Sequence, residues 1–278
     1  MNDLLERFSF ALKRDKFEAE FKNAMRRRNM TVTSRNGDIC VIKGDSSEFT
    51  LDISGLHKEY ERCPTEEVLG VLMRKIEREC DMEARMCSFT NGQEFLRLTV
   101  MRKEEVAADM ISSDFIGDLC RVIVYTSDDI VLHSLSDSVL KKWGMPQEVA
   151  FSVADRNMCR LLAKTEIKKT RLAEGVNAME FELPCGHLGV SFILCNDFRR
   201  TVYQYMGAKF LVAIPSRDSI LILENITNNI LEKLGNEIVR EYKRSEYPLT
   251  TDILLFTADD IRIAGHFAVK DKDGKDDT

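Results

Sequence analysis

The sequence lacks the long apolar runs and the paired cysteines that are typical of membrane and secreted proteins. Its longest clean apolar run, Leu188 to Cys195, is far shorter than the about 20 residues that cross a bilayer. Asp3 and Glu6 stand where a signal peptide carries basic residues, and no apolar segment of the required kind follows them. The eight cysteines include no C-x-x-C pair, and most lie among apolar neighbours. We therefore expect a cytoplasmic protein without a membrane span, whose thiols are reduced and mostly buried.

Histidine is scarce, and glycine is not arranged to hold phosphate. The four histidines, at positions 57, 133, 187 and 266, form neither an H-E-x-x-H motif nor any two-histidine spacing on one helix, so the sequence indicates no metal site. Gly186 and Gly189 do not lie between a strand and a helix, and no G-x-x-x-x-G-K-[ST] loop is present. We therefore expect no cofactor and no metal, and we assign no catalytic residue.

A basic excess is also absent. The chain has 40 basic and 46 acidic side chains, a net charge of -6 and a pI near 5.5. Proteins that neutralise phosphates usually carry a basic face, so this balance argues against nucleic acid and anionic membranes as partners. A nucleic-acid binder would need Arg26 to Arg28, Lys168, Lys169 and Arg171 on one face. We interpret the arginine run as positive charge in the last turn of a helix, where it complements the helix dipole.

Hydrophobic periodicity predicts an α+β lobe over residues 1–103. Asp15 with Glu18 resembles a capping box, which would restart a helix at that point. Asn36-Gly37 best tolerates the positive φ angles of a tight hairpin turn, and Thr65 is a typical helix N-cap. The predicted elements are two helices within residues 1–30, a hairpin of strands 31–33 and 39–42, a strand over 48–53, a helix over 66–80 and a strand over 95–101 that closes the lobe.

A second α+β domain is predicted over residues 114–269, after a linker and before a disordered tail over 270–278 that has no apolar residue. Three stretches read as two apolar strands around a polar turn, and two of these precede a helix, so a hairpin–helix unit is expected at least twice. The stretches are 122–132, 210–223 and 253–263. The other predicted elements are helices over 136–143, 146–162, 196–206 and 227–242, a polar stretch over 164–177, and strands over 179–183 and 191–194.

A polar turn between two apolar strands holds the best candidate for a ligand site. Ser216, Arg217 and Asp218 bring a hydroxyl, a guanidinium and a carboxylate together, and this combination suits an anionic ligand. Pro215 stiffens the entry to the turn. We expect Asp218 to accept backbone hydrogen bonds, which would leave Arg217 able to meet a ligand.

Other candidates have structural interpretations that we prefer. Cys185-Gly186-His187 offers a thiol next to a base, but Pro184 and Gly186 make this segment a turn by composition. Paired carboxylates would suit acid–base chemistry if the polar turns converged, yet aspartate is common in turns because it accepts backbone hydrogen bonds. Asn157 lies on an otherwise apolar helix face and is expected to hydrogen-bond between elements. The turn acids besides Asp218 are Asp128, Asp129, Asp259 and Asp260.

Residues of the second domain resemble the YtpQ-like family of bacterial proteins, a domain-of-unknown-function family. The resemblance rests on Trp143, on the helix with Ala154 and Asn157-Met158, and on the stretch from Phe210 to Leu223. It covers about Leu119 to Gly265 and implies a bacterial, cytoplasmic protein. It implies no reaction, cofactor or catalytic residue.

Two functions of different classes remain open from the sequence. The first is a non-enzymatic binding or interaction module for a partner protein or a small molecule. The alternative is a hydrolase whose site gathers Ser216, Arg217, Asp218 and neighbouring turn acids. The two are distinguished by whether these side chains converge in one concave pocket.

Overall fold

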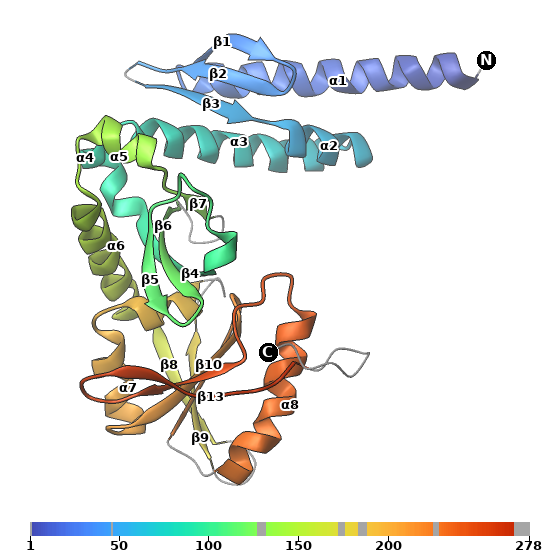
Figure 1. Ribbon diagram of the computed structural model, residues 1–278. Helices are drawn as coiled ribbons and strands as arrows, with labels where there is room; N and C mark the ends of the chain where they lie inside the picture. The colour runs from blue at the N-terminus through green and yellow to red at the C-terminus, as the bar shows by residue number, and fades with distance from the viewer. Residues whose placement is uncertain are drawn as a thin grey trace. The chain divides into compact units, whose positions relative to one another are not determined.

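The computed structural model describes residues 2–45, 47–126, 132–171, 176–182, 188–224 and 228–269. The chain forms two compact units, Met1–Gly92 and Gln93–Thr278 (Figure 1). Their helices are combined with three sheets in which all paired strands are antiparallel, so the fold class is α+β, as the sequence predicts. The expected tail over 270–278 lies outside the described residues.

The N-terminal unit combines helices with a three-stranded sheet of order β1-β2-β3. The predicted hairpin is confirmed, and Gly37 in its turn has a φ of +61°, which a residue with a Cβ rarely adopts. The predicted N-cap is also confirmed, since the Thr65 hydroxyl accepts from the Val68 backbone N–H. The elements are α1 (Asn2–Arg27), β1 (Thr31–Asn36), β2 (Ile39–Lys43), β3 (Glu48–Asp52), α2 (Ser54–Arg62), α3 (Glu66–Met86) and α4 (Phe89–Gly92).

The core of the N-terminal unit lies between the sheet and two long helices. α1 packs beside β1, α3 packs beside β3, and the two helices contact each other. Alternation along β2 buries Cys40 and Ile42 on the same face, as a half-covered antiparallel strand requires. Phe17 and Phe21 of α1 and Leu72 of α3 complete this core.

Two expectations for α1 differ from the structure. The helix does not restart at Asp15 but runs without a break from Asn2 to Arg27, because no glycine or proline interrupts its periodic apolar residues. Glu18 bonds to Arg35 of β1 instead of forming a capping box. The arginine run does lie at the end of the helix as expected, with Arg26 and Arg27 in its last turn, and Arg27 also pairs with Glu77 of α3 at 2.9 Å.

The C-terminal unit begins with a smaller sheet of order β4-β6-β5, with β7 also paired to β6. The strand expected to close the N-terminal lobe is β4, and that expectation is wrong: β4 pairs with β6 along its whole length and belongs to this unit. The elements are η1 (Gln93–Phe95), β4 (Leu96–Arg102), η2 (Lys103–Glu105), β5 (Ser112–Ile116), β6 (Leu119–Tyr125), β7 (His133–Ser134), α5 (Asp137–Trp143) and α6 (Gln147–Leu162).

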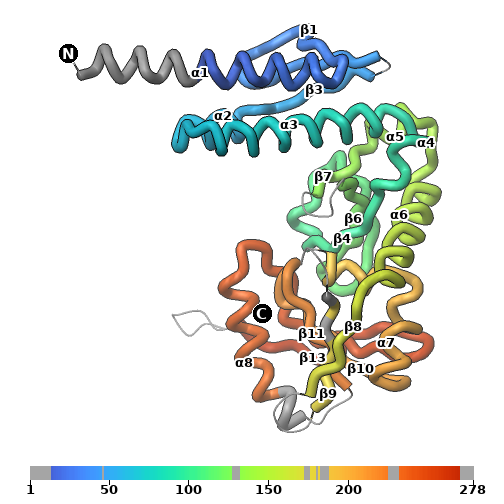
Figure 2. The backbone as a smooth tube through the Cα atoms, turned by 180° about the vertical axis from the view of Figure 1, so that it is seen from behind, coloured from blue at the N-terminus to red at the C-terminus, as the bar shows by residue number. Residues whose placement is uncertain are grey.

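A larger sheet of six strands follows, in the order β13-β12-β10-β11-β9-β8. Figures 1 and 2 show it between α8 and α7. The elements are β8 (Glu166–Arg171), β9 (Asn177–Glu182), η5 (Val190–Leu194), α7 (Phe198–Met206), β10 (Phe210–Ser216), β11 (Ser219–Glu224), α8 (Asn228–Arg244), β12 (Asp252–Phe256) and β13 (Ile261–His266).

Both faces of the central strand β10 are covered, so every one of its residues is buried. Leu211 and Ala213 face a cluster that includes Ile238 of α8. Phe210 faces the other way, where its ring stacks on Phe256 of β12 at 5.1 Å and also contacts Phe198 of α7. This double cover explains the almost unbroken apolar run of β10 and fixes α7 against the sheet.

Three further expectations for the C-terminal unit need correction. Residues 191–194 form part of the 3-10 helix η5, not a strand, because a short apolar run does not distinguish buried helix from buried strand. Part of the polar stretch 164–177 is the strand β8, at the edge of the large sheet. The repeated hairpin–helix unit is not confirmed: β6 and β7 lie in the smaller sheet, whereas β10–β11 and β12–β13 lie in the larger one. Among the described helices, none has the length and apolar character needed to cross a membrane.

Candidate ligand-binding pocket

The turn residues chosen from the sequence do not face one common space. Ser216 is buried, with 1% of its surface exposed, and its Oγ has no hydrogen-bond partner among the described residues. Asp218 is exposed at the corner of the turn. None of the three residues, Ser216, Arg217 or Asp218, lines either of the two larger cavities described below.

Arg217 is held by residues of the protein itself. Its Nη2 donates to Oε2 of Glu105 at 2.8 Å, and its guanidinium lies 5.1 Å from the ring centre of Tyr247. Glu105 also pairs with Arg102 at 3.4 Å, so one carboxylate of η2 joins two arginines. The guanidinium that was expected to meet a ligand thus links the turn between β10 and β11 to η2 within the C-terminal unit.

Other sequence candidates have structural roles or lie outside the described residues. Asn157 donates through its amide to the carbonyls of Gln93 at 2.8 Å and Leu96 at 3.0 Å, which confirms the predicted hydrogen bond between elements. Asp259 and Asp260 are exposed in the turn before β13. The segment Cys185-Gly186-His187 and the acids Asp128 and Asp129 lie outside the described residues.

A cavity of about 600 Å³ lies between the smaller sheet and the α7 side of the larger sheet, and we call it the arginine pocket. Its volume falls within the range of about 300 to 1,000 Å³ that is usual for small-molecule sites. Its lining comes from β5, β6, the segment from η5 into α7, and the strands β12 and β13 with the turn between them. The lining residues are Asp114, Phe115, Arg121, Ile193, Leu194, Cys195, Asn196, Phe198, Arg199, Arg200, Tyr203, Phe256, Ala258 and Ile261.

The sequence of α7 explains why its polar residues reach this pocket. Phe198, Val202 and Met206 recur every four residues and are buried against the large sheet. Arg199 and Tyr203 lie beside this apolar stripe, at the edge where the helix borders the cavity. Packing of α7 on the sheet therefore determines where its guanidinium groups lie.

Two arginines of the pocket have no carboxylate partner among the described residues: Arg121 and Arg199. Arg121 bonds to the Ser113 hydroxyl and lies 4.8 Å from the Phe151 ring centre. Arg199 donates to the Ala258 carbonyl at 2.9 Å, which holds it across the cavity toward the turn before β13.

The acids near the pocket do not neutralise these two arginines. Asp114 pairs with Lys103 at 3.3 Å, and Asp197 pairs with Arg200 at 2.9 Å. The guanidinium groups of Arg121 and Arg199 therefore give this part of the cavity wall a net positive charge. Such groups bind carboxylates and phosphates well.

A second cavity of about 720 Å³ differs in its charge pattern. Arg102 at its wall pairs with Glu104 at 2.9 Å, and Asp252 lies 3.5 Å from His266. Its lining therefore holds basic and acidic side chains next to each other. It shows no preference for a ligand of either charge.

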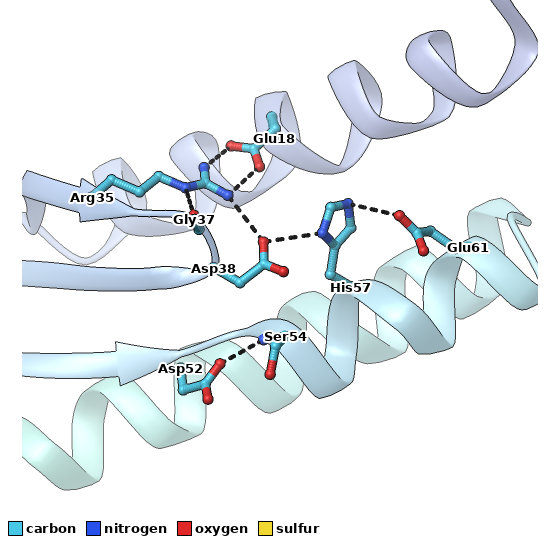
Figure 3. A network of polar contacts seen from close by, with 8 residues as sticks. All are labelled: Glu18, Arg35, Gly37, Asp38, Asp52, Ser54, His57 and Glu61. Atoms are coloured by element: carbon cyan, nitrogen blue, oxygen red, sulfur yellow. Dashed lines mark hydrogen bonds and ion pairs between the residues drawn. The ribbon is translucent and has the colours of Figure 1, made fainter. Parts of the chain in front are cut away.

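The N-terminal unit holds a polar network around a buried histidine (Figure 3). His57 Nδ1 lies 3.2 Å from Asp38 Oδ1, and Nε2 lies 3.7 Å from Oε1 of Glu61. Arg35 of β1, next to the turn that holds Asp38, bonds to Glu18 of α1. This hydrogen bond raises the pKa of Arg35.

An aspartate–histidine pair is typical of acid–base sites, but this imidazole is enclosed. Only 3% of the surface of His57 is exposed, and its ring stacks on Phe17 with centres 5.0 Å apart. It lines none of the cavities described above or the smaller one beside α3. We interpret the network as a connection between α1, the β1–β2 turn and α2.

Sequence reasoning missed the arginine pocket. Arg121 and Arg199 are far apart along the chain, and neither lies in a motif. The only sequence signal for the pocket is the apolar stripe of α7 with arginines beside it. That pattern does not show which part of the fold the arginines border. Comparison with protein-family models, with curated proteins and with solved structures finds no match.

Proposed function

We propose that this chain is a non-enzymatic binding protein whose arginine pocket takes a small organic anion. The observation that carries the proposal is the position of Arg121 and Arg199. Both line a cavity of about 600 Å³, and neither has a carboxylate partner among the described residues. A carboxylate or phosphate of the ligand would supply the missing negative charge.

The remaining lining indicates the rest of the ligand. Phe115, Phe198, Phe256 and Tyr203 give the cavity aromatic surface beside the two arginines. Apolar walls with a few oriented polar groups are typical of sites for small organic molecules. We therefore expect an aromatic or aliphatic body that carries one anionic group.

The geometry favours this function over the hydrolase alternative. A hydrolase built on Ser216, Arg217 and Asp218 needs these side chains in one concave site. Ser216 is buried, Arg217 is paired with Glu105, and Asp218 is exposed. We also propose that the chain is a member of the YtpQ-like family, and therefore a bacterial, cytoplasmic protein.

The proposal is tested with 8-anilinonaphthalene-1-sulfonate, a fluorescent aromatic anion. We expect saturable binding, and competition by benzoate and phenyl phosphate but not by the neutral benzyl alcohol. Arg199→Gln should weaken binding about ten-fold or more, because a hydrogen bond to a charged group contributes roughly 1.5 to 3 kcal/mol. Arg121→Gln should act in the same direction.

Arg62→Gln is the matched control, since it removes an exposed arginine of α2 in the other unit. It should leave the affinity for the probe unchanged. Circular dichroism of each variant separates lost binding from lost folding. Equal competition by benzyl alcohol and benzoate, or unchanged affinity in both pocket variants, would show that the arginines do not select an anion.

A further inference from the structure

Two cysteines that are far apart in the sequence meet at the wall of the arginine pocket. Cys159 lies near the end of α6, and Cys195 is the residue that links η5 to the segment before α7. Their Sγ atoms are 2.8 Å apart. Among the described cysteines, no other two have their sulfurs in contact.

A nearby carboxylate holds the two segments in this position. Asp155, one turn before Cys159 on α6, accepts from the backbone N–H of Asn196 at 3.0 Å and from its side-chain amide at 2.6 Å. Asn196 directly follows Cys195. These two bonds therefore fix the backbone beside one sulfur to the helix that carries the other.

The two thiols differ in accessibility. Cys195 is buried, with 4% of its surface exposed, whereas Cys159 is half-buried. Burial raises the pKa of Cys195, and the adjacent Cys159 thiol adds to the shift, while the backbone N–H of Asp197 opposes it. Cys159 is thus the thiol that an external reagent reaches first, and Cys195 is the one that follows.

From this geometry we infer that Cys159 and Cys195 form a redox-active pair that closes reversibly to a disulfide. The oxidant class is a low-molecular-mass disulfide, RSSR. The Cys159 sulfur, as thiolate, attacks one sulfur of RSSR, breaks its S–S bond and releases RS⁻. The Cys195 sulfur then attacks Cys159, displaces the second RS⁻ and completes the protein disulfide. Two electrons pass to RSSR, and the two thiol protons end on two RSH molecules.

A metal site is the competing interpretation, because Asp155, Cys159 and Cys195 place their ligand atoms within 4.8 Å of one another. Both carboxylate oxygens of Asp155 already accept hydrogen bonds from Asn196. Zn²⁺ with Zn–S bonds of about 2.3 Å in a tetrahedral arrangement needs sulfurs farther apart than 2.8 Å. A disulfide, with an S–S length of about 2.05 Å, needs no further ligand. The donor set therefore favours the disulfide.

The test uses the full chain in mixtures of reduced and oxidised glutathione, followed by differential alkylation and peptide mass spectrometry. As the mixture becomes more oxidising, Cys159 and Cys195 should lose alkylation together. A linked peptide pair should appear, two mass units below the sum of the free thiol peptides, and dithiothreitol should reverse it. The readout does not depend on the ligand of the pocket, so it can fail while the proposed binding function holds.

Cys159→Ser should abolish the linked pair and leave Cys195 free to react after denaturation. Cys63→Ser, which removes an exposed cysteine, is the matched control and should leave the pair intact. Wild-type mapping needs no variant, so a folding defect would not hide the result. The inference is overturned if both thiols stay free under conditions that modify Cys63, or if Cys159 keeps a glutathione adduct. Retention of one Zn²⁺ that Cys159→Ser releases, with no disulfide in the zinc-free protein, would also overturn it.

Discussion

Arg217 connects two parts of the C-terminal unit through a half-buried ion pair. Its guanidinium bonds to Glu105 at 2.8 Å and covers the Tyr247 ring, and a quarter of each side chain of the ion pair is exposed. Arg217→Ala leaves Glu105 with only the longer contact to Arg102. We expect the free energy of unfolding to fall by about 1 to 3 kcal/mol, as when a charged group loses its hydrogen-bond partner.

Urea denaturation followed by circular dichroism measures this effect. Arg62→Ala, which truncates an exposed arginine, should stay within about 0.5 kcal/mol of the wild type. If Arg217→Ala is equally neutral, the guanidinium contributes no stability. The sequence-based interpretation of Arg217 as a ligand contact would then regain its basis.

The role of a single residue is predictable where it follows from the residue type or from its neighbours in the sequence. Asn157 was expected to hydrogen-bond between elements because a buried amide must find partners, whatever they are. Thr65 and Gly37 were assigned correctly because caps and tight turns depend on adjacent residues. Arg217 and Arg199 could not be assigned, since their partners come from segments that only the tertiary fold brings near.

At the scale of elements, α8 contacts Phe267, the residue that follows β13, through a glycine. A Cβ placed on Gly235 would lie 2.4 Å from Cε1 of Phe267, too close for any real contact. Gly235→Ala gains about 1 kcal/mol of helix propensity but must displace this ring. We expect a net loss of about 1 to 3 kcal/mol in the free energy of unfolding, as for overpacking.

Two further variants isolate the contact in chemical denaturation. In a Phe267→Ala background, Gly235→Ala should become stabilising, because only the helix propensity remains. Gly70→Ala in α3 is the control: its added Cβ meets only Arg74 Nη1, at the ordinary distance of 3.6 Å, so it should stabilise. A stabilising Gly235→Ala in the wild-type background would mean that the ring moves without cost.

Elements with a long amphipathic pattern were predicted well from the sequence. The helices α3, α6 and α8 and the hairpin β10–β11 lie close to their expected positions, because their apolar residues repeat over many positions. The elements that were predicted wrongly have short or polar sequence patterns. The five residues of η5 fit a buried strand equally well, and the polar edge strand β8 has little apolar alternation to detect.

At the scale of the whole molecule, the division into units depends on strand pairing between distant residues. The segment from Gln93 to Lys103 has no glycine or proline that marks a boundary, so its strand was assigned to the preceding lobe. In the structure, β4 pairs with β6 and contacts α6 and η5. The unit boundary therefore falls before β4, between Gly92 and Gln93, and not at the expected residue 103.

This boundary predicts which fragments of the C-terminal unit fold. Residues 93–278 keep β4, whose Leu96, Leu98 and Val100 are at most 1% exposed. The fragment 104–278 lacks these three side chains. Emptying each buried site lowers the free energy of unfolding by about 2 to 5 kcal/mol. The whole free energy of unfolding of a domain is about 5 to 15 kcal/mol, so the three losses together are comparable to it. We expect cooperative urea unfolding for 93–278 and none for 104–278.

The N-terminal unit provides the complementary test, because the described residues of its core cluster lie between Phe17 and Cys80, with Ala84 packed against them, all before residue 92. Residues 1–92 should therefore unfold cooperatively by themselves. Extending this fragment to residue 103 adds β4 without its partner strand β6, so the added strand should not raise the midpoint of unfolding and should expose apolar surface. A higher midpoint for 1–103 than for 1–92, together with cooperative unfolding of 104–278, would place β4 with the N-terminal lobe after all.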